Sequence, residues 1–308
     1  MDTPIAFDTT PFLGPFEIGV LASMVGFGVS TTQTYIYYNR FPDDSLKLKT
    51  LVAFVWALEL ARNLCLGHAL YIFTISDFGH SERILGADPR SLGVGGLLDG
   101  LIGMCVQGFF SSRIYRFSER LYVPVIIWFL ALVRLLGGIG IMITGLRMKS
   151  VVVYEMQWKW LLLADWSISA FNDVLITLSL VFLLYRQRGN GLKRTVALVD
   201  KLILWTIETG MITSISAIVT VIAFITMKQN LVWEAIFVAN AGLLSNSLLA
   251  SLNSRATLRA MDKIPNTHIS IPFTESGLPR SGIQTRKSTN GTDESEGSNT
   301  MEMSVEEV

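Results

Sequence analysis

Long apolar blocks dominate the chain, and short polar stretches separate them. Seven such blocks lie at residues 14–38, 48–75, 92–113, 121–146, 158–185, 200–226 and 231–254. An α-helix needs about 20 mostly apolar residues to cross the hydrocarbon core of a bilayer. Soluble helices of this length would instead alternate apolar and polar faces. The pattern therefore predicts an all-α integral membrane protein with a seven transmembrane helix bundle.

The third block departs most from a simple apolar span. Its sequence, "LGVGGLLDGLIGMCVQGFFSSR", contains Asp99, Gln107 and six glycines. Small residues let helices approach each other closely in lipid. We therefore still expect this block to cross the membrane.

Basic residues near the block ends predict the orientation. No Lys or Arg precedes Arg40, so the first block lacks the basic start of a cleaved signal peptide. One side of the membrane would collect 14 Lys and Arg and the other side 6. The positive-inside rule then places the N-terminus outside and the C-terminus in the cytosol. We expect a short extracellular N-terminus (1–13), a transmembrane domain (14–254) and a disordered cytosolic tail (255–308).

Composition supports this picture. Only 16% of the 308 residues are charged, against roughly 25% in a soluble domain. The formal net charge is zero, which gives no reason to expect nucleic acid as a partner. The partner that the composition does predict is the lipid bilayer.

Polar residues interrupt the last block at "SNSLLASLNSR" (245–255). At about 100° per residue, Asn246 and Asn253 share one face with several serines, and leucines take the opposite face. The polar face should look into the bundle, where it forms hydrogen bonds with neighbouring helices or lines a cavity.

Ionisable residues inside spans are costly, so they are candidates for function. Glu59, Arg62 and Asn63 share one face of the second helix, and Glu59 can pair directly with Arg62. Asp99 and Asp165 should lie near the outer ends, in contact with water. The candidate network, with a ligand-binding or a structural role, comprises Glu59, Arg62, Asn63, Arg134, Asp173, Glu208, Asn246 and Asn253.

Several membrane protein classes are excluded. A retinal protein needs a lysine in the last helix, and residues 231–254 contain none. The chain has only three histidines, and His80, expected outside, cannot meet His268 in the cytosolic tail, which excludes a His-rich metal site with His68. The rhodopsin-like receptor motifs are missing as well. We find no catalytic constellation, and we expect no cofactor and no metal.

Four segments carry a resemblance to a known family. They are "LGPFEIGVLASMVGFGVSTTQTYIYYNRF" (13–41), "VQGFFSSRIYRFS" (106–118), "DKLILWTIETGMITSISA" (200–217) and "SNSLLASLNSR" (245–255). Together they resemble a fungal seven-helix membrane protein family, the domain of unknown function 6534. The resemblance covers roughly residues 13–255. It implies the fold but no activity, ligand or site residue.

Three function classes and a scaffold role remain open. The first is a receptor-like, sensory protein of the plasma membrane. It would bind a small or lipophilic ligand within the helix bundle and meet a cytosolic effector at its basic loops and tail. The second is a transporter or channel that uses the buried acidic residues. The third is a membrane enzyme acting on lipid, and a membrane scaffold is the remaining possibility.

Overall fold

The computed structural model describes residues 10–78, 89–147, 151–188, 193–227 and 230–263, and every described element is helical. All of them belong to one compact unit, Met1–Pro265. The elements are α1 (Thr10–Arg40), α2 (Leu46–Tyr71), the π-helical turn η1 (Ile72–Ser76), α4 (Arg90–Ser118), α5 (Tyr122–Arg147), α6 (Val151–Arg188), α7 (Lys193–Thr226) and α8 (Val232–Lys263). The predicted all-α fold is confirmed.

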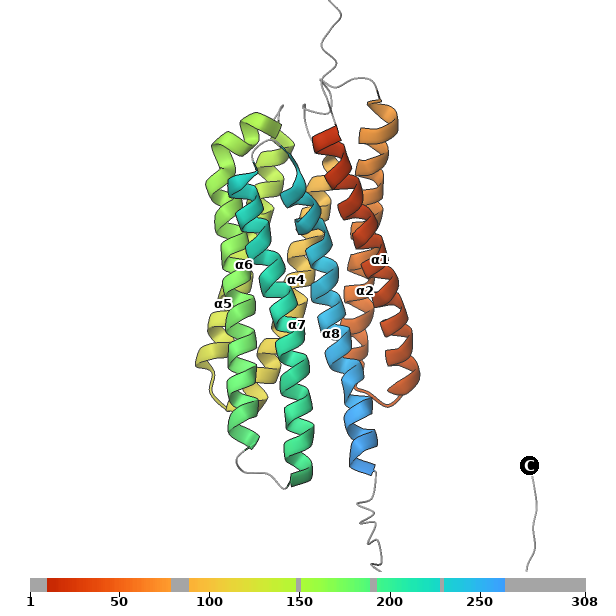
Figure 1. The fold of residues 1–308 in the computed structure, drawn as a ribbon, viewed down its shortest axis with the longest axis vertical. Coiled ribbons are helices and arrows are strands. Elements are labelled where there is room, and N and C mark those ends of the chain that lie inside the picture. Colours follow the sequence, from red (N-terminus) through yellow and green to blue (C-terminus); the bar gives the residue numbers. More distant parts are fainter. Residues whose placement is uncertain (1–9, 79–88, 148–150, 189–192, 228–229, 264–308) are drawn as a thin grey trace, which may run out of the picture. The chain divides into compact units, whose positions relative to one another are not determined.

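The long helices run up and down side by side as one bundle (Figure 1). Neighbours around the bundle follow the order α1, α2, α4, α5, α6, α7 and α8, and α8 packs back against α1. Helix α4 also contacts α6 and α8, so it has neighbours on most sides. Its glycines suit this position, because small side chains let several helices approach one backbone.

Six helical runs are long and apolar enough to cross a membrane. They are Leu13–Arg40, Leu46–Ser76, Arg90–Ser118, Tyr122–Arg147, Gln157–Arg186 and Val232–Ala256. The molecule is therefore a multi-pass membrane protein. The third block, which contains Asp99, is among these six. Helix α7 covers the sixth block, but its described apolar part, Gly210–Thr226, is shorter than a span.

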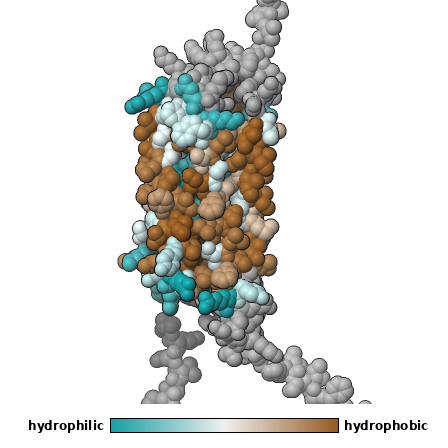
Figure 2. Space-filling view, turned by 90° about the vertical axis from the view of Figure 1, so that its left-hand side faces the viewer, coloured by the Kyte–Doolittle hydropathy of each residue, from teal (hydrophilic) through white to brown (hydrophobic). Residues whose placement is uncertain are grey.

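The outer surface of the bundle has the polarity expected for lipid contact. On the α5 side, a broad band of hydrophobic residues lies between two hydrophilic ends (Figure 2). Large apolar side chains are exposed on these helices, including Phe129 of α5 and Phe171 and Phe182 of α6. A soluble bundle would cover such a surface, whereas acyl chains solvate it in a membrane.

The leucines of α8 pack inside the bundle. Leu248, Leu249 and Leu252 are at most 2% exposed, and they join a core cluster that includes Ile102 and Val106 of α4. The leucine face expected from the sequence therefore contacts protein rather than lipid. The same helix continues to Lys263, past residue 255, where we expected the tail to begin. Residues 1–9 and 264–308 lie outside the described part, so the predicted disorder of the tail stays a prediction.

Candidate functional site

Arg62 of α2 is fully buried between α1, α4 and α8. Its Nη1 donates a hydrogen bond to the hydroxyl of Ser23 on α1 at 2.8 Å, and its Nη2 donates one to the carbonyl of Val238 on α8. Its Nε forms an ion pair with the carboxylate of Asp99 on α4. Asn63 supports this arrangement, since its Oδ1 accepts a 3.0 Å bond from Ser23. One guanidinium thus connects four helices.

The expected pair between Glu59 and Arg62 does not form. The two side chains share a face of α2 but extend in opposite directions along the helix axis. Ser30 and Ser245, the polar neighbours of Glu59, lie about two turns, roughly 10 Å, beyond the residues that Arg62 contacts on α1 and α8. Asp99 takes the place of Glu59 because α4 brings its carboxylate to the guanidinium.

Glu59 is left in an unusual state. Its side chain is 1% exposed, and neither carboxylate oxygen has a hydrogen-bond partner among the described residues. The hydroxyl of Ser245, which lies nearby, is likewise buried without a partner in that part of the chain. An ionised carboxylate in such a place is costly unless it gains a hydrogen bond, a counter-charge or a proton.

A second guanidinium, that of Arg134 on α5, is also buried. Its Nε lies 3.9 Å from Oδ2 of Asp165 on α6, which is an ion pair but too long for a hydrogen bond. Glycines make room for both groups. A Cβ on Gly103 of α4 would collide with the guanidinium, and one on Gly137 would lie 2.8 Å from Oδ1 of Asp165. The glycines of α4 and α5 therefore accommodate a buried ion pair.

Asp173 of α6 forms the third polar cluster. Its Oδ1 accepts a hydrogen bond from Gln107 Nε2 of α4 at 3.0 Å. The other end of Gln107, Oε1, accepts one from Asn172 Nδ2 at 2.9 Å. Oδ2 of Asp173 is buried and has no partner within the described ranges. Gln107 thus ties two adjacent residues of α6 to α4 and leaves one carboxylate oxygen unmatched.

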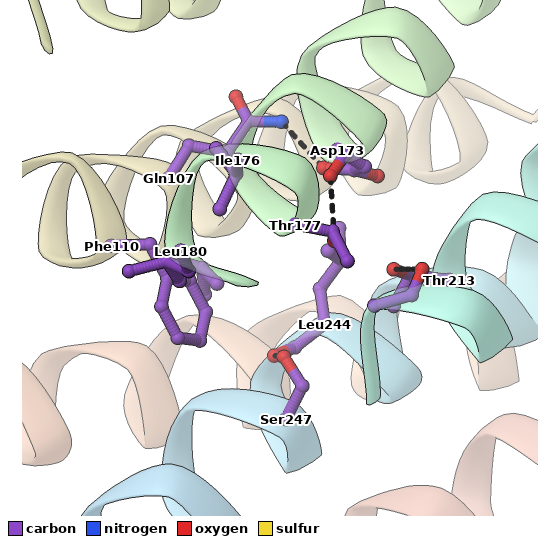
Figure 3. A pocket seen from close by; sticks show the side chains of 11 residues that line it. Gln107, Phe110, Asp173, Ile176, Thr177, Leu180, Thr213, Leu244 and Ser247 are labelled. Atoms are coloured by element: carbon purple, nitrogen blue, oxygen red, sulfur yellow. Dashed lines mark hydrogen bonds between the residues drawn. The ribbon is translucent and has the colours of Figure 1, made fainter. Parts of the chain in front are cut away.

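A small cavity adjoins this cluster, between α4, α6, α7 and α8. Figure 3 shows Asp173 and Gln107 on one side and Thr213 and Ser247 on another. Its volume is about 30 Å³. A water needs about 10–15 Å³ measured in this way, so the cavity has room for about one or two waters but not for a drug-sized molecule.

The polar face of α8 joins it to α1. Asn246 Nδ2 donates to the carbonyl of Gly26 at 3.1 Å, and its Oδ1 accepts from Ser30 at 3.1 Å. About two turns further, Asn253 Nδ2 donates to the carbonyl of Gln33 at 2.9 Å. These bonds between helices are those that the wheel position of the two asparagines suggested. Their partners are backbone and hydroxyl groups, so Asn246 and Asn253 form a structural seam.

Carboxyl groups outnumber guanidinium groups in the interior. Within the described residues, the fully or nearly fully buried carboxyls are Glu59, Asp99, Asp165 and Asp173, and the buried guanidiniums are Arg62 and Arg134. We call these six residues the buried array. If all were ionised, the array would carry two uncompensated negative charges. Protons, ordered water or a cation must offset them.

Three acidic residues differ in burial from what the sequence suggested. Glu208 is exposed on α7 and lies outside the buried array. Asp99 and Asp165, which we expected near water, are buried at 5% and 9% exposure. Each lies beside an arginine of a neighbouring helix, and that neighbour could not be known from the sequence. No cluster of three or more His, Cys, Asp or Glu able to hold a metal ion occurs among the described residues.

Comparison with known proteins adds a family match. Residues 169–257 match the model of a family of unknown function, DUF6534. This stretch includes the second half of α6, all of α7 and most of α8, and over these residues it confirms the resemblance to the domain of unknown function 6534. No curated protein and no solved structure matches the chain.

Proposed function

We propose that the protein is a receptor-like, sensory membrane protein in which protonation of the buried array sets the packing of the helices. In this proposal it crosses the plasma membrane seven times, with α7 as the additional span. Its N-terminus is outside, and its basic cytosolic loops and tail meet an effector. The array contacts α1, α2, α4, α5, α6 and α8, so a change in its charge would act on most of the bundle.

One observation carries the proposal: both carboxylate oxygens of Glu59 are buried without hydrogen-bond partners among the described residues. Neutral Glu59 fits this place, where its polar neighbours are the uncharged hydroxyls of Ser30 and Ser245. Loss of its proton would leave a bare charge, and the helices would then rearrange to bring water or a donor to it. Ser30 of α1 and Ser245 of α8 are the donors within reach of such a rearrangement.

The size of the cavity beside Asp173 favours a proton as the effector at this part of the array. The cavity beside Asp173 holds about 30 Å³. That volume suits one or two waters, which could carry a proton, rather than a small-molecule ligand. The alternative function, a transporter or channel, would use the same carboxyls. A flux measurement distinguishes the two.

The first test is infrared difference spectroscopy of the purified full chain in lipid nanodiscs. A buried, protonated carboxyl gives a carbonyl band that a carboxylate does not. We expect this band in the wild type at neutral pH and a weaker band in Glu59→Gln. The control is Glu119→Gln, which alters an exposed carboxyl and should leave the band unchanged. An identical band in Glu59→Gln would refute protonated Glu59.

The second test asks what the proton does. Hydrogen exchange of α2 and α8 should differ between mildly acidic and mildly alkaline buffer in the wild type, but not in Glu59→Gln.

Proteoliposomes with a pH-sensitive dye inside should show no proton flux. Flux that Glu59→Gln abolishes would support the transporter. Proximity labelling at the C-terminus should recover an effector whose association depends on Glu59; its absence at every pH would contradict the sensory role.

A further inference from the structure

An apolar groove runs along the outside of the bundle between α4 and α5. Its volume is about 540 Å³, within the range of about 300–1,000 Å³ that small-molecule and cofactor sites occupy. It opens on the surface. Its lining includes Met104, Tyr115, Val125, Trp128, Phe129 and Leu132.

Specific packing builds the floor of the groove. Gly108 lets the ring of Trp128 lie against α4, since a Cβ there would come within 2.9 Å of the indole. The Ser111 hydroxyl donates a 3.1 Å hydrogen bond to the Pro124 carbonyl, which holds the start of α5 to α4. The rim stays open, with Trp128 45% exposed and Phe129 64% exposed. The groove is therefore a fixed depression in the hydrophobic surface.

The groove is polar and basic at one end only. Ser112 and Tyr115 line that end, where α4 finishes. Arg116 lies one turn after Ser112 on the same side of α4 and is exposed, and Arg120 is exposed in the turn to α5. Glu119, also exposed, offsets one of these charges, which leaves a net positive end. The opposite end of the groove consists of apolar side chains.

We propose that this groove binds an anionic glycerophospholipid of the surrounding bilayer. The acyl chain would lie along the apolar part of the groove, and the phosphate would lie at the basic end. There Arg116, Arg120 and the hydroxyl of Tyr115 supply hydrogen-bond donors. Tyr115 and Trp128 combine an apolar ring with a polar group, which suits the depth where acyl chain meets headgroup.

The net positive charge at the basic end of the groove favours an anionic lipid over other occupants. A sterol offers only a hydroxyl and would gain little from two arginines. A second copy of the chain would bring its own basic end to the same place. A zwitterionic lipid fits the groove but has no net charge to match the arginines. This site is separate from the buried array and does not depend on protonation of Glu59.

Native mass spectrometry of the full chain, released from detergent with phosphatidylglycerol or phosphatidylcholine, tests the proposal. We expect bound phosphatidylglycerol in preference to phosphatidylcholine. Arg116→Gln should weaken phosphatidylglycerol binding about tenfold, as expected for loss of one charge-assisted contact. Val125→Trp, which places an indole in the groove at an exposed position, should reduce binding of both lipids.

Two matched variants serve as controls. Arg90→Gln removes an exposed arginine at the other end of α4, and Leu21→Trp adds an indole on the exposed face of α1. Both should bind phosphatidylglycerol as the wild type does. Equal binding of the two lipids, or no effect of either Arg116→Gln or Val125→Trp, would overturn the proposal. So would displacement of phosphatidylglycerol by a sterol, or a dimer that Val125→Trp disrupts.

Discussion

Replacement of Asp99 by Asn should be among the most destabilising single changes in the bundle. The guanidinium of Arg62 is fully buried, and Asp99 supplies its counter-charge. Removing one partner of a buried ion pair typically costs about 3–5 kcal/mol, because the other charge stays buried without compensation. Arg62 cannot relieve this by losing its proton. The expected loss is a large part of the free energy of unfolding of a typical protein, which is about 5–15 kcal/mol.

Replacing Arg62 instead of Asp99 should lower the free energy of unfolding by less. In Arg62→Met the carboxyl of Asp99 can take up a proton and become neutral, an escape that the guanidinium lacks. Arg62→Met together with Asp99→Asn leaves no buried charge at this point. Replacing a buried pair by uncharged groups of similar size is often close to neutral. The double variant should therefore be more stable than Asp99→Asn alone by about 2 kcal/mol or more.

Steric-trapping or denaturant unfolding in bicelles measures these free energies. Asp43→Asn, which alters an exposed carboxyl near the start of α2, is the control and should stay within about 0.5 kcal/mol of the wild type. Additive losses in the double variant would show that Arg62 and Asp99 act independently. A loss below about 1 kcal/mol in Asp99→Asn would refute the assigned pairing altogether.

Two further predictions concern the seam between α1 and α8 and use the same unfolding measurement. Gly19→Ala should lower the free energy of unfolding by about 1–3 kcal/mol, because the new Cβ would lie 2.6 Å from the backbone of α8. Gly28→Ala, whose Cβ would meet nothing within 4 Å, is the control and should leave the free energy of unfolding almost unchanged. Equal effects of the two substitutions would contradict the packing. Asn246→Ala, which loses bonds to two residues of α1, should cost about 1–2 kcal/mol and more than Asn253→Ala, which loses one; the reverse order would contradict the assigned bonds.

Sequence periodicity predicted the spans well and the contacts between them less well. Six of the seven blocks are helices long enough to cross a membrane, because an apolar stretch of this length has few other stable forms in lipid. Periodicity also gives the angle of a residue around its helix, and so it correctly grouped Glu59 with Arg62. It does not give the direction in which a side chain extends along the helix axis. This direction brings Arg62 to Asp99 rather than to Glu59.

The burial of the acidic residues also differs from what the sequence suggested. Asp99 was expected near water because a lone acid near the start of a span usually remains wet. The arginine that makes its burial possible comes from another helix, 37 positions earlier in the chain. Glu208 shows the converse, since its place in the middle of a block suggested burial. Its side of α7 is exposed, and only the packing of neighbouring helices decides which side of an apolar helix is inside.

The family match and the polar contacts together bear on how the bundle is organised. The matched stretch, 169–257, contains Asp173 and Asn246 but not the partners that these two side chains have on α4 and α1. Asp173 depends on Gln107 of α4, and Asn246 depends on the carbonyl of Gly26 on α1. Polar groups of this kind are costly in lipid when their partners are missing. Helices α6 to α8 therefore need α1 and α4 beside them, and the matched stretch is one part of a single structural unit.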